Sequence, residues 1–291
     1  MADHLFALAF DHRTSLMTEF FGVEGEPSDD DVSRAHTAKL VIWEGLARAI
    51  DEGAVARQEA AALIDATYGT EAIVEARAAR VRVAMPVEAS GRTELTFEQV
   101  RWRDRLDTLD PAWAEVVVRY NPDGDAELNA RQRAALGALA DHCRAADHPL
   151  MLEMLVPPEP SQDGPDYDTA VRPGLTVRAI AEIRGDGIDA DVWKVEGLGR
   201  REDCEAVARA AGAPCIVLGR EEDRGAVDGW LRAAAGVDGF VGFAIGRSIW
   251  WEALQGFFTA GGTDEARAAA VAMIAAEYGQ YVGVYTAGVD T

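Results

Sequence analysis

Lysine is nearly absent from this chain. Only two of its 28 basic residues are lysines, Lys39 and Lys194, and the others are arginines. Where a positive charge is needed only to keep the surface soluble, this sequence uses arginine. A lysine that is kept is therefore expected to do what a guanidinium cannot, such as lose its proton and attack a carbonyl group.

Other features that are scarce or missing narrow the class of protein. The three cysteines form no metal-binding spacing, which fits a reducing cytoplasm. The five histidines show no HxH or HExxH pattern, so we expect no metal site and no cofactor. No run reaches the roughly 18 uncharged apolar residues of a membrane span, and the first residues lack the features of a signal peptide. These absences predict a cytoplasmic protein.

Positive charge is also in short supply. The formal net charge is −22, and such a field repels nucleic acid and anionic membranes. A small anionic substrate would need a local basic pocket to overcome it.

Short apolar runs of strand length alternate with segments of helical period, as in repeated βα units. The runs are LFALAFD (5–11), AALID (61–65), VRVAMPV (81–87), AEVVVRY (114–120), PLMLEMLV (149–156), DVWKVEG (191–197), PCIVLG (214–219) and GFVGFAIG (239–246). Eight runs in 291 residues predict an α/β fold, one (β/α)₈ TIM barrel over 1–291.

The helical segments between these runs are bounded by recognisable signals. Ser33 is expected to cap a helix over 33–52, and Asp223 one over 224–235. A further amphipathic helix over 263–285 is expected to pack on the outside of the barrel or on another subunit, and we expect a homo-oligomer.

In such barrels the active site lies at the carboxyl ends of the strands. The last polar residues of the runs are Asp11 with His12 and Arg13, Asp65, Glu88, Arg119, Glu153, Lys194 with Glu196, Arg220, and Arg247. So many ionisable groups at one end of a barrel predict a site there.

Lys194 lies within an apolar strand, where burial disfavours the ammonium form and a catalytic amine needs a lowered pKa. The alternative is a buried structural ion pair with Glu196, which alternation places on the same face. Glu153 is surrounded by apolar neighbours on an adjacent strand, so it is either a proton-transferring group beside the lysine or one half of a salt bridge.

The last two strands each end in Gly-Arg, namely Gly219-Arg220 and Gly246-Arg247. The loops after these strands often bind phosphate, because glycine lets backbone N–H groups approach and arginine adds a two-pronged contact. Solvated arginines beside helix starts are the alternative.

Taken together, the strand ends resemble a known family. The motifs are DVWKVEGL, VVVRYNPDGD, LMLEMLVP, CIVLGR and GFAIGRSIWW. They are similar to the bacterial aldolase-like domain often fused behind the sugar kinase of inositol catabolism, and more distantly to tagatose-bisphosphate aldolases. The resemblance covers about 5–285.

The resemblance implies a metal-independent class I aldolase. It places the Schiff base on Lys194, the proton shuttle on Glu153 and an aspartate of the site on Asp11, with Gly246 and Arg247 binding phosphate. The implied reaction cleaves 2-deoxy-5-keto-gluconate 6-phosphate to dihydroxyacetone phosphate and malonate semialdehyde.

One position departs from the relatives. They carry a lysine early in the fourth strand, where this chain has Glu115, and Arg119 on the same face would supply the cation instead. The departure leaves the substrate open, and the chain carries no kinase domain. Two alternatives remain: a biosynthetic aldolase acting on another sugar phosphate, and a non-catalytic barrel that binds a sugar phosphate.

Overall fold

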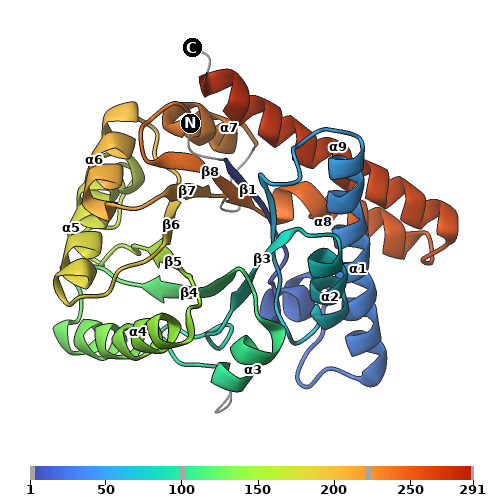
Figure 1. The fold of residues 1–291 in the computed structure, drawn as a ribbon, viewed down its shortest axis with the longest axis horizontal. Helices are drawn as coiled ribbons and strands as arrows, with labels where there is room; N and C mark the ends of the chain where they lie inside the picture. Colours follow the sequence, from blue (N-terminus) through green and yellow to red (C-terminus); the bar gives the residue numbers. More distant parts are fainter. Residues whose placement is uncertain (1–3, 99–101, 220–223, 290–291) are drawn as a thin grey trace.

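Eight parallel strands close into a barrel in the computed structural model, which describes residues 4–98, 102–219 and 224–289. Each strand pairs with the next along the chain, and β1 also pairs with β8. The strands are β1 (Leu5–Ala9), β2 (Ala60–Leu63), β3 (Arg82–Pro86), β4 (Trp113–Arg119), β5 (Leu150–Leu155), β6 (Val192–Glu196), β7 (Cys215–Leu218) and β8 (Phe240–Ile245). The predicted (β/α)₈ barrel is confirmed, with one strand in each apolar run (Figure 1).

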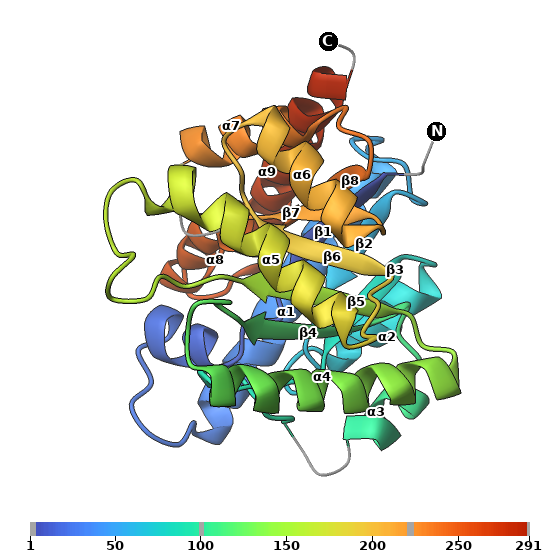
Figure 2. The ribbon, with the colours of Figure 1, turned by 90° about the vertical axis from the view of Figure 1, so that its left-hand side faces the viewer.

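Helices surround this barrel and cover its outer face (Figures 1 and 2). The α-helices are α1 (Asp29–Asp51), α2 (Thr70–Ala78), α3 (Trp102–Leu109), α4 (Ala126–Ala146), α5 (Arg172–Gly185), α6 (Arg201–Ala211), α7 (Arg224–Ala234), α8 (Arg247–Thr259) and α9 (Asp264–Val289). Two short π-helical turns, η1 (Leu16–Phe20) and η2 (Tyr167–Val171), follow β1 and precede α5. No helix in the described part of the chain is long and apolar enough to cross a membrane.

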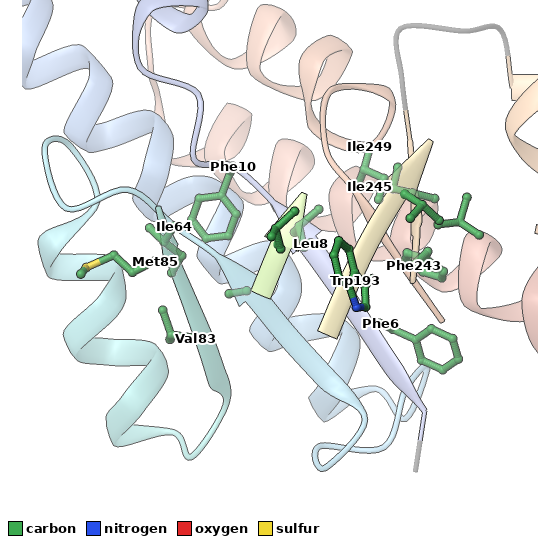
Figure 3. Packing of buried hydrophobic residues seen from close by; sticks show 14 of the residues in the cluster. Phe6, Leu8, Phe10, Ile64, Val83, Met85, Trp193, Phe243, Ile245 and Ile249 are labelled. Carbon is green, nitrogen blue, oxygen red and sulfur yellow. The ribbon is translucent and has the colours of Figure 1, made fainter. Parts of the chain in front are cut away.

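Most strand residues are apolar because both faces of the barrel sheet are buried. In β1, Phe6 and Leu8 point outward into the layer between strands and helices, as Figure 3 shows. Leu5, Ala7 and Ala9 belong to a second, smaller cluster with residues of the other strands. That cluster fills the interior below the site and gives it a rigid floor.

The start of α1 differs from the prediction. Ser28, not Ser33, is the N-cap: its hydroxyl accepts from the Asp31 N–H at 3.2 Å, and the Asp31 carboxylate accepts from the Ser28 N–H at 3.0 Å. This reciprocal capping box extends the helix by one turn through a run of acidic residues, which the helix N-terminus favours. The predicted cap Asp223 lies outside the described residues.

The C-terminal helix α9 packs on the outside of its own barrel, against α1, α7 and α8 (Figure 1). Its Tyr278 and Tyr285 hydroxyls donate to the backbone carbonyls of Phe6 and Phe240, at 2.8 and 2.9 Å. Where α1 crosses it, Gly45 leaves room for Ile274, and a side chain at that glycine would collide with the isoleucine. The last helix is thereby fastened to both the first and the last strand.

Candidate active site

A two-lobed cavity opens at the carboxyl ends of the strands. The larger lobe has a volume of about 610 Å³ and the smaller one about 160 Å³. The two lobes adjoin, since five residues line both: Asp11, His12, Arg119, Glu153 and Leu155. The larger lobe also contains Lys194, Glu196, Gly246 and Arg247. Most of the residues expected at the site from the sequence therefore converge on this cavity.

Lys194 lies on the wall of the larger lobe with its side chain almost fully buried. It is paired in register with Glu153 of the neighbouring strand β5, and its ammonium forms an ion pair with that carboxylate. A second carboxylate, Glu115 of β4, lies 3.3 Å from Nζ. The alternative partner expected from alternation, Glu196, faces the same cavity but accepts instead from the Val156 N–H at 2.8 Å.

These carboxylates determine the protonation state of Lys194. Burial alone would lower the pKa of its ammonium, but the negative charges of Glu153 and Glu115 outweigh burial and raise it well above its usual value. The shift is opposite to the one expected for a buried nucleophile. At rest the amine is charged, so it becomes nucleophilic only when a neighbouring base accepts its proton.

Glu115 is the most deeply buried acid of the site, with 1% of its surface exposed. Burial raises its pKa well above the usual carboxyl range, and the attraction of Lys194 only partly offsets this. Glu88 and Glu153 add to the increase because they are negative neighbours. The sequence marked Glu115 as a charge reversal, but it gave no indication that its carboxyl group would contact the lysine.

Asp11 and His12 follow β1 and line both lobes. Burial raises the pKa of Asp11, but its neighbours, foremost His12 and the Lys194 ammonium, overcome this effect and lower it overall. Burial lowers the pKa of His12 to about 4, so its imidazole is neutral at physiological pH. Its ring lies edge-on to Trp250, with centroids 5.2 Å apart. The sequence placed His12 at a strand end but assigned it no role.

The guanidinium group of Arg13 is already occupied. It donates to Glu88 Oε1 at 2.6 Å and to Glu98 Oε2 at 3.1 Å, and it is buried beside the smaller lobe. Arg119 remains on the wall of both lobes, where its Nη1 donates to the backbone carbonyl of Arg92 at 3.0 Å. Of these two predicted substrate-binding arginines, Arg119 is the one placed to meet a ligand.

The predicted phosphate site lies where β8 meets α8. Gly246 is the N-cap of α8 and Arg247 its first residue, and both line the larger lobe. A side chain at Gly246 would collide with the backbone carbonyl of Ala9, so the approach of these strands requires glycine there. Arg247 donates to the largely exposed Glu19 at 2.8 Å. The predicted partner Arg220 lies outside the described residues.

The other lysine does not line the cavity. Lys39 of α1 is buried and lies 2.6 Å from Asp65, and it donates to the carbonyls of Phe10 and His12. It holds the segment that leaves β1 and thereby positions Asp11. The rarity of lysine thus selects two buried residues, only one of which faces the cavity.

No group of three or more His, Cys, Asp or Glu side chains that could hold a metal ion occurs in the described ranges. The free cysteines Cys143, Cys204 and Cys215 are buried, and burial raises the pKa of each thiol. The reactive groups on the cavity wall are an amine, carboxyl groups, an imidazole, guanidinium groups and hydroxyl groups.

Comparison with known proteins finds one family profile over nearly the whole chain and solved structures of low sequence identity. A family profile described as "Uncharacterized protein conserved in bacteria (DUF2090)" matches residues 1–288. No curated protein matches the sequence.

Solved structures resemble the chain over nearly its whole length. The fructose-bisphosphate aldolase of Plasmodium falciparum, in a ternary complex with TRAP and an inhibitor, has 12% identity and a TM-score of 0.65, covering 96% of this chain and 90% of that one. Cgl0159 of Corynebacterium glutamicum has 18% identity and a TM-score of 0.58, covering 94% and 85%. An archaeal fructose 1,6-bisphosphate aldolase has 15% identity and a TM-score of 0.54, covering 95% and 94%. These likenesses show a shared barrel fold.

Proposed function

This chain belongs to the DUF2090 family, and we propose that it is a class I aldolase that forms a Schiff base on Lys194. The observation that carries the proposal is the position of the Lys194 amine, buried on the wall of a large polar cavity and in contact with Glu153. An amine and a carboxyl group in contact at a barrel's strand ends supply both the nucleophile and the proton carrier that imine chemistry needs.

The steps follow from this pair. Glu153 accepts a proton from the Lys194 ammonium, and the free amine attacks the substrate ketone. Water is lost with a proton from Glu153, which leaves a positively charged iminium. Glu153, again a carboxylate, removes the proton of the hydroxyl group next to the bond to be cleaved. The bond breaks, its electrons move into the iminium to form an enamine, and an aldehyde is released. Asp11 accepts hydrogen bonds from the substrate hydroxyls.

A phosphorylated keto sugar or keto sugar acid is the substrate class that we propose. Gly246 and Arg247 at the start of α8 line the larger lobe, and a helix start with a guanidinium group beside it suits a phosphate. Arg119 lies where it can meet a second anionic group, and Glu196, which also lines the larger lobe, is assigned to the substrate hydroxyls. A substrate with phosphate and carboxylate ends, such as 2-deoxy-5-keto-gluconate 6-phosphate, fits this distribution, with dihydroxyacetone phosphate and malonate semialdehyde as products.

One observation favours a second candidate. The two carboxylates beside Lys194 raise the pKa of its ammonium and hold it charged, which suits a non-catalytic barrel that binds sugar phosphates through a fixed cation. Such a protein would bind the same ligands and form no covalent bond.

Borohydride reduction separates the two candidates, because it converts an imine into a permanent amine. Treatment with dihydroxyacetone phosphate and borohydride should add mass to the peptide that contains Lys194 and to no other. An adduct on Lys39, or none on either lysine, would exclude the Schiff-base mechanism.

A further inference from the structure

We propose that Glu115 is a further catalytic residue: the general acid that protonates the substrate's carbonyl oxygen while Lys194 bonds to the carbonyl carbon. The inference rests on the Schiff-base function proposed above. Its starting point is that Glu115 Oε1 lies 3.3 Å from Nζ, the reacting atom.

The barrel register brings two carboxyl groups to one amine from different depths. Val117 of β4 pairs with Glu153 of β5, so Glu115 lies one inward-facing position deeper than Glu153. Both carboxyl groups line the smaller lobe, whereas Lys194 lines the larger one. A carbonyl group attacked by the lysine therefore meets two carboxyl groups that contact the same Nζ, Glu153 on the wall of both lobes and Glu115 on the wall of the smaller one.

Charge balance assigns different roles to the two acids. Around Glu115 lie one cation, Lys194, and three acids: Glu88, Glu153 and Asp11. Burial raises the pKa of Glu115, whereas Glu153 is more exposed, at 13%, and forms the closer ion pair. A carboxyl group whose pKa is raised by burial is suited to donate a proton as a general acid. That role is assigned to Glu115.

The step balances with these groups alone. Glu153 takes a proton from the ammonium, and the neutral amine forms the C–N bond. As the carbonyl π bond breaks, Glu115 gives its proton to the oxygen, and its carboxylate then removes the surplus proton from the nitrogen. Glu153 protonates the hydroxyl group, the C–O bond breaks, and water leaves. The products are an iminium, water, a neutral Glu115 and an ionised Glu153, so no outside acid is consumed.

The test is the rate of Schiff-base formation in Glu115→Gln. The amide has the shape and neutrality of the carboxyl group but cannot give up a proton. With dihydroxyacetone phosphate as the probe and borohydride quenching at short times, adduct formation at Lys194 should be slower by about 10²–10⁴-fold. The dissociation constant of the probe should stay within a few-fold of wild type. Glu115→Asp keeps an acid and should recover part of the rate.

The pH profile distinguishes catalysis from support. In the wild type the rate should fall as pH rises through the raised pKa of Glu115, because only the protonated form donates. Glu115→Gln should lack this alkaline loss, which a residue that merely supports the fold would not control.

Three other results would overturn the role of Glu115 or the aldolase function itself. Adduct formation at the wild-type rate in Glu115→Gln would overturn the role of Glu115 and leave the aldolase function standing. Absence of any adduct in the wild type would overturn both. If Glu115→Gln fails to fold, Glu115→Asp decides: its shorter side chain withdraws the carboxyl group from Nζ, so an unchanged rate and pH profile would exclude the acid.

Discussion

Lys39 Nζ lies 2.6 Å from Asp65 Oδ2, and both side chains are closed off from solvent. The same ammonium donates to the carbonyls of Phe10 and His12, just where the chain leaves β1 for the active site. This lysine therefore supports the site through the backbone and does not enter the cavity.

Replacing Lys39 by methionine should be strongly destabilising. The substitution leaves the buried Asp65 without its cation, and breaking a buried pair from one side commonly costs about 3–5 kcal/mol. Urea denaturation measures the change in the free energy of unfolding. Arg48→Ala, which removes an exposed pair with Glu52, is the matched control and should cost below about 1 kcal/mol. Equal stability of Lys39→Met and wild type would show that the pair is dispensable.

Glu153→Gln should leave the fold intact and reduce turnover by about 10²–10⁴-fold, the usual effect of removing a positioned acid–base group. Steady-state kinetics and a thermal melt of the same sample measure both effects. Glu127→Gln, an exposed position on α4, controls for loss of one negative charge. A near-normal kcat in Glu153→Gln would assign the carboxylate to a structural pair with Lys194 and move the proton shuttle elsewhere.

Arg247→Ala should act mainly on KM for phosphorylated substrates. The loss of a charge-assisted contact is commonly worth about 1.5–3 kcal/mol, roughly a ten- to hundredfold change in affinity. The contact exists before and during cleavage alike, so kcat should change little. Arg247→Lys should recover only part of the affinity, because an ammonium cannot make the two-pronged contact.

An unphosphorylated analogue is the control for Arg247. The analogue never uses the proposed clamp, so its kinetics should be the same in Arg247→Ala and wild type. If Arg247→Ala raises KM equally for the phosphorylated substrate and the analogue, Arg247 supports the rim of the barrel through its contact with Glu19.

Stability should decrease on acidification partly because of His12. Its pKa is about 4 in the folded protein, against an ordinary value of 6.5. Between pH 6.5 and pH 4, His12 is protonated in the unfolded chain but stays neutral in the folded protein. Its contribution to the free energy of unfolding is therefore fully present above pH 6.5 and is lost as the pH falls to about 4. The full effect is at most roughly 3 kcal/mol, and it is weakened because 20% of the side chain is exposed.

His12→Gln removes this titration. Denaturation midpoints recorded from pH 7 to pH 4 should show a smaller acid-induced loss in the variant than in wild type. Parallel curves for the two proteins would mean that His12 does not carry the difference.

The sequence predicts the barrel well because each strand is short, apolar and separated from the next by a helix. It also predicts that Glu153 and Lys194 are neighbours, since consecutive strands of a barrel pair. Two features of the site could not be predicted from the sequence, and both have the same cause. Glu115 reaches the lysine from two strands away, which depends on the stagger of the strands, and the raised pKa of Lys194 follows from that contact. Local pattern carries no information on stagger.

The N-cap of α1 was predicted wrongly for a different reason. The acidic run at 28–31 fits either a solvated turn or a helix start, so its pattern does not choose between Ser28 and Ser33. Only the reciprocal bonds between Ser28 and Asp31 favour the earlier start.

The fastening of α9 to both ends of the barrel also bears on how the protein is made. The face of α1 that receives Ile274 belongs to the first βα unit, and the partner that covers it follows the eighth. While the ribosome is still translating the intervening strands, this apolar face has no intramolecular cover. The nascent chain therefore presents a surface of the kind that chaperones bind, and it withdraws that surface only when its last helix docks.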